Sequence, residues 1–172
     1  MTTTRTSSGR LPRSVRAAAI ALVAGAGITL TPTVASASAT AGVPAAVPVS
    51  YVAAPTRAAQ IAVDTALAQV GKPYAWGGSG PGSFDCSGLV QFAYRAAGVG
   101  LPHSSRMQSA IGIPLNVWDL RPGDLLFFYS PVSHVAMYIG NGLMVQAPTY
   151  GHPVSVVRAA SMPGFHNARR VA

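Results

Sequence analysis

Apolar residues recur at helical spacing in two stretches of the chain. In the first stretch, Thr56 suits the N-cap of a helix that runs through Val70, because a threonine hydroxyl can accept a backbone N–H of the first turn. Ile61, Leu67 and Val70 are spaced to form one apolar face, and Gly71 suits the end of the helix. We therefore expect an amphipathic helix here.

The second stretch predicts a helix from about Cys86 to Ala97, with Gly98 after its end. Residues 73–83 lie between the two helices, are rich in glycine and aromatic residues, and are expected to form a loop. A short third helix is expected after Ser104. The apolar side of the second helix would consist of Leu89, Phe92, Ala93 and Ala96.

After Trp118 the pattern changes to short apolar runs separated by Gly, Pro and Asn. These runs are rich in β-branched or aromatic residues, as is typical of strands. Because helices come first and strands follow, the order indicates an α+β domain with an antiparallel sheet rather than a doubly wound parallel one. The predicted strands are residues 124–129, 135–139, 143–147 and 154–157.

Residues 1–39 are predicted to be a secretory signal peptide. They contain four arginines without an acid, then an almost wholly apolar run over 17–30, then a small-residue site at 35–39. The run is short for a bilayer span, so we expect cleavage after Ala37 or Ala39, with a retained N-terminal anchor as the alternative. No integral membrane segment would remain after cleavage.

The composition narrows the function classes further. The formal net charge is +8, and cleavage would remove four of the twelve Lys and Arg residues, leaving +4. No basic stripe with interleaved aromatic residues remains, which argues against nucleic-acid binding. Residues 40–55 are uncharged and rich in Ala, Pro and Val, as expected of a linker, and residues 56–172 would form one domain.

Cys86 is the only cysteine, which excludes an internal disulfide and a clustered-thiolate metal site. Its predicted position in the first turn of a helix favours thiolate over thiol, because unpaired N–H groups and the helix dipole stabilise an anion there. We therefore interpret Cys86 as a nucleophile. A small buried core residue is the alternative, and the polar neighbours Asp85 and Ser87 argue against it.

A thiol nucleophile needs a base, and His134 at the start of a predicted strand can serve as one. The base needs an orienting partner, for which Gln146 is the candidate. A two-residue Asn-Gly loop would turn Gln146 to the opposite face of the sheet. A three-residue loop over 140–142, with a bulge at Gly142, would place Gln146 beside His134, so the hypothesis predicts that register.

Four motifs, at residues 72–78, 84–90, 121–125 and 133–142, together resemble the NlpC-type cell-wall cysteine endopeptidases. The resemblance extends over roughly residues 56–160. It implies a papain-like α+β fold in which N-terminal helices pack on a central antiparallel sheet. It also implies hydrolysis of peptidoglycan stem peptides, usually at the bond between the γ-D-glutamyl residue and the diamino acid at position three.

The resemblance also assigns roles to residues. Cys86 matches the nucleophile, His134 the base, Gln146 the third polar position, and Tyr74 an aromatic hydroxyl that stabilises the oxyanion with the Cys86 backbone N–H. Relatives commonly have Arg where His103 stands, and histidine lacks the two-pronged contact that arginine makes with a substrate carboxylate. The expected substrate contacts are Asp85 and Ser87, which match positions that contact the free amino end of the stem peptide, together with Trp76, His103, Ser104 and Ser133. For Trp76 and Trp118, packing in a loop or in the core is the alternative to ligand contact, and it is the commoner role of tryptophan.

The leading hypothesis is a secreted, cell-wall-associated, monomeric peptidoglycan hydrolase that works through a thioester on Cys86. It needs no metal or organic cofactor. The alternatives are the same residues acting on a different amide bond or transferring the acyl group, and a non-catalytic wall-binding module. A membrane-surface protein is a further alternative that no basic amphipathic helix supports.

Overall fold

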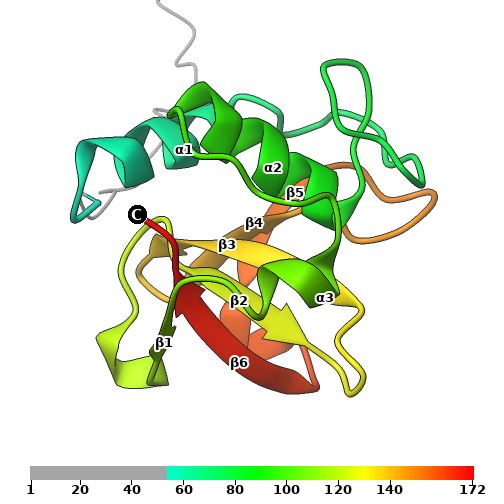
Figure 1. Cartoon of the computed structure of the whole chain (residues 1–172). Helices are drawn as coiled ribbons and strands as arrows, with labels where there is room; N and C mark the ends of the chain where they lie inside the picture. The colour runs from blue at the N-terminus through cyan, green and yellow to red at the C-terminus, as the bar shows by residue number, and fades with distance from the viewer. Residues whose placement is uncertain (1–53) are drawn as a thin grey trace, which may run out of the picture. The chain divides into compact units, whose positions relative to one another are not determined.

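The structure, a computed structural model, describes residues 54–172. The predicted signal peptide and the linker up to residue 53 lie outside the described residues. Helices pack on one face of a six-stranded sheet (Figure 1). The elements are α1 (Arg57–Leu67), α2 (Cys86–Ala96), α3 (Ser105–Gln108), β1 (Ile113–Leu115), the 3-10 turn η1 (Val117–Asp119), β2 (Leu125–Phe128), β3 (His134–Gly140), β4 (Leu143–Gln146), β5 (Ser155–Arg158), the 3-10 turn η2 (Ala159–Ser161) and β6 (Phe165–Arg170).

Helix α1 begins as predicted and ends early. The Thr56 hydroxyl accepts the Ala59 N–H at 3.0 Å, but the helix stops at Leu67, and Val70 is 48% exposed. The predicted apolar face was only partly right, because it counted only large residues: Leu67 packs against the core, but Val70 does not. Small side chains let α1 approach α2 closely, and the buried face consists of Ala59, Ala62, Val63 and Ala66.

Helix α2 begins at Cys86 because Asp85 caps it, with Oδ1 accepting the Gly88 N–H at 2.7 Å. Position 88 requires glycine, since a Cβ there would lie 2.0 Å from the Gly78 carbonyl oxygen. The predicted face was only partly right: α2 contacts both α1 and β3, so Val90 and Tyr94 are also buried, whereas Phe92 is half-buried and Ala96 exposed.

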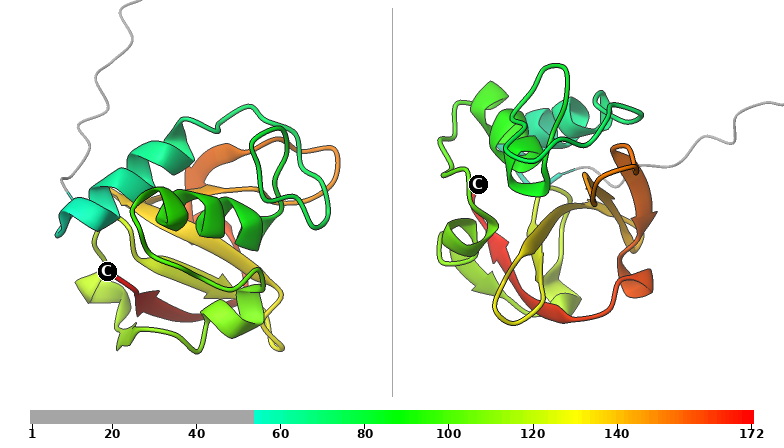
Figure 2. Two further views of the ribbon diagram at one scale, coloured as in Figure 1. Left: turned by 45° about the horizontal axis from the view of Figure 1, so that its top comes forward. Right: turned by 90° about the vertical axis from the view of Figure 1, so that its right-hand side faces the viewer.

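The sheet is antiparallel throughout, in the order β1-β6-β2-β3-β4-β5. It curls, and α1 and α2 cover one face (Figure 2). The four predicted strands are present, and the α+β order of helices before strands is confirmed. The prediction missed β1, which has three residues, and β6, whose sequence FHNARR lacks an apolar run.

Two apolar clusters lie on the two faces of the sheet. The cluster beneath the helices contains Phe127, Val135, Met137 and Val145, and the cluster on the opposite face contains Leu126, Phe128, Ala136 and Met144. The alternation along β2, β3 and β4 therefore assigns every second residue to the helix-covered face.

An ion pair ties β6 to the start of β2. Arg170 donates from Nη2 to Asp124 Oδ2 at 2.7 Å and from Nε to Oδ1 at 2.8 Å, and the Asp124 side chain is almost fully buried. Asp124 also accepts the Arg121 N–H. The sequence pattern places Asp124 at the opening of the predicted strand 124–129, as a turn residue, whereas the structure makes it the buried acceptor for a strand that lies in the interior of the sheet.

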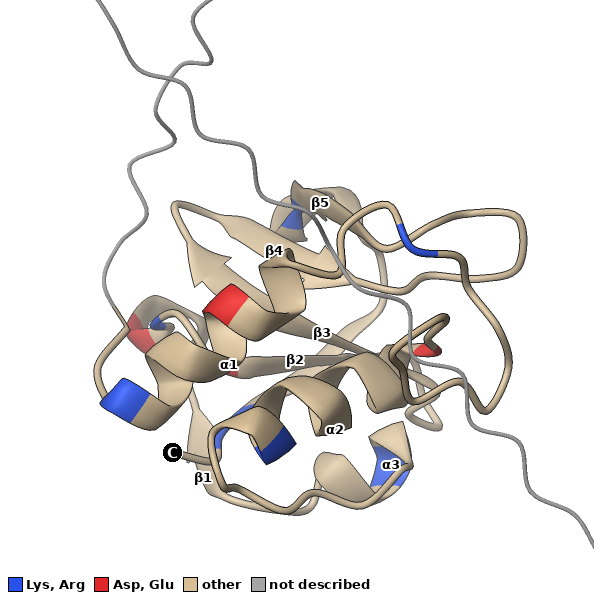
Figure 3. Cartoon of the chain, turned by 90° about the horizontal axis from the view of Figure 1, so that it is seen from above, with Lys and Arg blue, Asp and Glu red and all other residues tan. Residues whose placement is uncertain are grey.

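Within the described range 54–172, no helix is both long and apolar enough to cross a bilayer. Figure 3 shows Lys and Arg spread singly over the helices and loops that face the viewer. That distribution gives this face no concentrated basic surface.

Replacing Arg170 by alanine is expected to destabilise the fold by about 2 kcal/mol, because it leaves a buried carboxylate without its charged donor. Urea unfolding of Arg170→Ala against the wild type measures the loss. Arg158→Ala is the matched control, since Arg158 is exposed in β5. Equal loss in both variants would contradict the role assigned to this ion pair.

Candidate active site

A hollow of about 240 Å³ lies where the N-terminus of α2 meets the start of β3. Five segments line it: the loop before α2, the first turn of α2, the segment that leads into α3, the start of β3, and the loop between β4 and β5. It brings together most of the side chains that the sequence singles out. These are Tyr74, Trp76, Asp85, Cys86, Ser87, His103, Ser133 and His134, joined by Gly77, Ser105 and Pro148.

Cys86 is the first residue of α2, and its thiol is held against β3. A hydrogen bond from the Val135 backbone, and others from Ser87 and from Cys86 itself, lower the pKa of the thiol, but burial outweighs them, and Asp85 raises it further. The net pKa lies above the ordinary value of 9.0. The expectation that the helix start would favour the thiolate was therefore wrong in net effect, because desolvation of the anion dominates.

His134 is the first residue of β3, and it belongs to the sheet face opposite the helices. It pairs with Phe128, and the two rings lie 5.9 Å apart. Its terminal position in the strand nevertheless lets it line the same hollow as Cys86. Burial lowers the pKa of the imidazole, and the hydrogen bond with Gln146 raises it by less. Neutral imidazole is therefore the favoured form near pH 7.

Gln146 determines which ring nitrogen of His134 is free. His134 Nε2 lies 2.8 Å from Gln146 Oε1. Because an amide oxygen can only accept, Nε2 must carry the proton, and the unprotonated nitrogen of the neutral ring is Nδ1. The buried side chain of Gln146 thus leaves His134 with one basic nitrogen.

The register that brings Gln146 to His134 is the predicted one. Met137 pairs with Val145 and Tyr138 with Met144, so Gln146 falls on the same face as His134. The position of the bulge differs from the prediction: the register shifts between Tyr138 and Gly140, not at Gly142. Asn141 and Gly142, both with positive φ, form the turn itself.

Tyr74 enters the hollow from the loop before α2. An isolated bridge between Tyr74 and Phe84, with Ala75 N–H donating to the Phe84 carbonyl at 3.0 Å, fixes its backbone beside the start of α2. Desolvation, with the nearby Cys86 and Asp85, raises the pKa of the Tyr74 phenol. The hydroxyl therefore stays protonated and can donate a hydrogen bond into the hollow.

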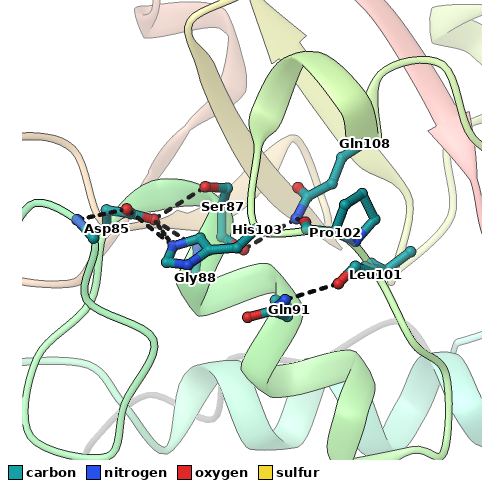
Figure 4. A network of polar contacts seen from close by, with 9 residues as sticks. Asp85, Ser87, Gly88, Gln91, Leu101, Pro102, His103 and Gln108 are labelled. Atoms are coloured by element: carbon teal, nitrogen blue, oxygen red, sulfur yellow. Dashed lines mark hydrogen bonds and ion pairs between the residues drawn. The ribbon is translucent and has the colours of Figure 1, made fainter.

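Asp85 is the centre of a polar network (Figure 4). Its carboxylate accepts from the Ser87 hydroxyl at 3.1 Å, from Gly77 N–H at 2.9 Å and from Gly88 N–H, and His103 Nε2 lies 3.0 Å from both oxygens. A carboxylate offers about four acceptor positions, so these contacts fill it. An ammonium group arriving here would have to displace a group already in place.

Sequence reasoning missed Gln108, a fully buried residue of α3. Its Nε2 donates to the Ser87 carbonyl at 3.1 Å and to the Pro102 carbonyl at 2.8 Å, which joins the segment carrying His103 to the first turn of α2 (Figure 4). The only available signal was a polar residue in a four-residue helix, which is too short to show a buried face.

One expected substrate contact, Ser104, does not line the hollow, whereas Trp76 does. Ser104 is the N-cap of α3, accepting from Met107 N–H, and its neighbour Ser105 lines the hollow instead. Trp76 lines the hollow with its ring 90% exposed, and Trp118, outside the hollow, is 91% exposed. The packing role that is commoner for tryptophan was wrong for both.

No cluster of three His, Cys, Asp or Glu side chains that could hold a metal ion occurs in the described part of the chain. The hollow offers instead a thiol, a neutral imidazole with one basic nitrogen, and hydrogen-bond donors. This set of groups is suited to nucleophilic attack on a carbonyl carbon with proton transfer through the imidazole.

Comparison with known proteins identifies the family to which the domain belongs. Residues 71–167, more than half of the chain, match the model of the NlpC/P60 family. A protein of Mycobacterium tuberculosis described as a probable endopeptidase is 56% identical over 108 residues, which are 63% of this chain and 28% of that protein. The chain thus corresponds to less than a third of this relative's length.

Solved structures agree with the sequence match. The peptidoglycan hydrolase RipB of M. tuberculosis superposes with a TM-score of 0.62 at 30% identity, over 66% of this chain and 64% of RipB. The P60 domain of a Mycobacterium avium subspecies paratuberculosis antigen gives 0.61 at 32% identity, over 66% of this chain and 94% of that domain. The predicted NlpC-type α+β fold is confirmed, and the chain belongs to the NlpC/P60 family.

Proposed function

We propose that this protein is a cysteine endopeptidase that hydrolyses peptidoglycan stem peptides, at the bond between the γ-D-glutamyl residue and the diamino acid. The observation that carries the proposal is the hollow that Cys86 and His134 share, with Gln146 bound to the far nitrogen of the imidazole. The family model covers residues 71–167, which include all three, and the chain is similar to a probable endopeptidase and to a peptidoglycan hydrolase.

In the first half of the reaction, the proton of the Cys86 thiol moves to Nδ1 of His134 as the sulfur bonds to the carbonyl carbon. The carbonyl electron pair moves to oxygen. When the tetrahedral intermediate collapses, the C–N bond breaks, and the proton on Nδ1 passes to the leaving amine. A thioester on Cys86 remains. The Nε2–H bond to Gln146 keeps the ring in one orientation throughout.

The oxyanion of the intermediate needs donors fixed in advance. The Cys86 backbone N–H lies at the start of α2, where no earlier turn of the helix supplies it with an acceptor. The Tyr74 hydroxyl, protonated because its pKa is raised, is the second candidate donor from the wall of the hollow. Together they would bind the negative oxygen as it forms.

In the second half, a water molecule gives a proton to His134 Nδ1, and its oxygen adds to the thioester carbonyl. The C–S bond then breaks, and the sulfur takes the proton back from the imidazole, which restores the resting pair. Acyl transfer would follow the same steps with an amine in place of water. The substrate lies in the cell wall, so the proposal includes export directed by residues 1–39.

Digestion of purified peptidoglycan, with mass spectrometry of the products, tests the reaction and its bond. We expect fragments with a new amino end on the diamino acid and a new carboxyl end on the glutamyl residue. Cys86→Ala should release none of them, because no other thiol exists in the chain. Products cut at another amide bond would refute the assigned specificity, and unchanged lysis by Cys86→Ala would refute the mechanism.

His134→Ala is expected to lower kcat/KM by at least about a thousandfold, since both proton transfers pass through its ring. His166→Ala is the matched control: His166 lies exposed on β6, outside the hollow, and its loss should leave turnover unchanged. Similar activities for the two variants would remove His134 from the mechanism.

The titration of Cys86 can be measured directly, because its thiol is the only thiol in the sequence. The pKa of Cys86 is raised above 9.0 and that of His134 is lowered below 6.5, so the resting pair is neutral near pH 7. Alkylation by iodoacetamide should therefore be slow at neutral pH and reach half its maximal rate above pH 9. The acid limb of kcat/KM should fall below pH 6.5, where His134 gains a proton. Fast alkylation that persists below pH 7 would indicate a thiolate–imidazolium pair instead.

Variants of Gln146 distinguish two effects on His134: the orientation of its ring and the influence of a neighbouring negative charge on its pKa. Gln146→Ala removes the acceptor of a buried N–H and should lower kcat/KM by about tenfold. Gln146→Glu places a carboxylate beside Nε2, which raises the pKa of His134 and favours the thiolate, so the alkylation profile should move to lower pH. If both variants left that profile and kcat/KM at wild-type values, Gln146 would have no part in the site.

A further inference from the structure

A second hollow of about 350 Å³ adjoins the one that holds Cys86. Pro73 and Tyr74 form one of its walls, and Tyr150, His152 and Pro153 from the loop between β4 and β5 form the other. The proposed mechanism makes no use of it.

The two hollows share their boundary. Tyr74 lines both, and the β4–β5 loop contributes Pro148 to the first and Tyr150 to the second. A chain-like substrate whose scissile carbonyl lies at Cys86 therefore continues into the second hollow if it extends past Tyr74. The second hollow is thus positioned as an extension of the substrate groove rather than as a separate site.

The walls of the second hollow are fixed in place by backbone hydrogen bonds. Gly71 N–H donates to the Val154 carbonyl, and Val154 N–H donates to the Lys72 carbonyl, both at 2.8 Å. A bridge between Thr149 and His152 closes the tip of the loop. Figure 2 shows the β4–β5 loop beside the loop that precedes α2. The surface is therefore formed before any ligand arrives.

The chemistry of this hollow differs from that of a site for charged groups. Among the described residues that line it, none is Lys, Arg, Asp or Glu. The Lys72 ammonium group points elsewhere, donating to Gln69 Oε1 and the Pro81 carbonyl. What remains is the flat ring of Tyr150, 84% exposed, with hydroxyl and imidazole groups that exchange hydrogen bonds.

These features favour an uncharged ligand with one apolar face and several hydroxyl or amide groups. The ends and side chains of a stem peptide carry carboxylate and ammonium groups, which would lie here without a counter-charge. A sugar ring of the glycan strand is uncharged, presents C–H groups on its faces, and has hydroxyl and acetamido groups at its edge. Of the two parts of peptidoglycan, the sugar is the better chemical match.

We propose that this second hollow is a sugar subsite, in which the ring of Tyr150 stacks on an N-acetylated sugar of the glycan strand while Cys86 acts on the attached stem peptide. The subsite rests on the proposed peptidoglycan hydrolase function and deepens it. It makes the glycan part of what the enzyme recognises, so the preferred substrate is a stem peptide still joined to its sugar. The amino end of that peptide is an amide and not the free amine that the resemblance assigns to Asp85 and Ser87, in keeping with the filled acceptor positions of Asp85.

Two matched substrates test the subsite: a stem peptide joined to its disaccharide and the same peptide without sugar. For the wild type, kcat/KM should be higher with the disaccharide present. Tyr150→Ala should lower the ratio of the two kcat/KM values by about tenfold through KM, whereas Tyr150→Phe, which keeps the ring, should largely preserve it. Trp118→Ala removes an equally exposed aromatic ring outside both hollows and should leave the ratio at its wild-type value.

Each other outcome overturns the proposal. An equal loss on both substrates in Tyr150→Ala would mean that the hollow binds peptide, and wild-type kcat/KM on both substrates would mean that it binds neither part. A wild type that cuts neither substrate would instead refute the proposed hydrolase function. Circular dichroism and thermal unfolding of each variant identify a change that comes from misfolding.

Discussion

The geometry of the cleft depends on one buried carboxylate, that of Asp85. It receives donors from the loop before α2 at Gly77 and from the first turn of α2 at Ser87 and Gly88, and it contacts His103 from the segment before α3. All three segments line the hollow. Because Cys86 follows Asp85 directly, the same contacts determine where the thiol lies. Asp85, which the resemblance gives as a substrate contact, therefore also has a structural role: it holds the segments of the cleft together.

Burial sets the charge state of the reacting pair. The thiol and the imidazole are both partly removed from water, which penalises thiolate and imidazolium alike. A carboxylate behind His134 would offset this penalty, but the chain has a neutral amide at Gln146, which orients the ring and adds no charge. In the proposed reaction, the proton would therefore move from the thiol to the imidazole only when the sulfur attacks. A thiol that stays protonated is also slow to react with oxidants, since the thiolate is the reactive form.

Structural features that depend on local sequence pattern can be predicted from the sequence, whereas features that depend on tertiary packing cannot. The N-cap at Thr56, the start of α2 at Cys86 and the four strands β2 to β5 follow from residue type and spacing. The buried face of α1 does not, because alanines contribute to it only through close contact with α2. Strand β6 is polar and is held by the ion pair between Arg170 and Asp124, which lie 46 residues apart. Gln108 is recognisable only once α3 lies beside α2.

The active site also depends on a single extra residue in β3. His134 and Gln146 share the sheet face opposite the helices because the register shifts between Tyr138 and Gly140. With a regular ladder across the Asn-Gly turn, Gln146 would pair with Met137 and point into the core beneath α2, as Val145 now does. Cys86 comes from the helix-covered side and His134 from the other, so they can meet only at the end of the sheet. The position of His134 as the first residue of β3 is therefore what lets its imidazole line the same hollow as Cys86, which α2 carries.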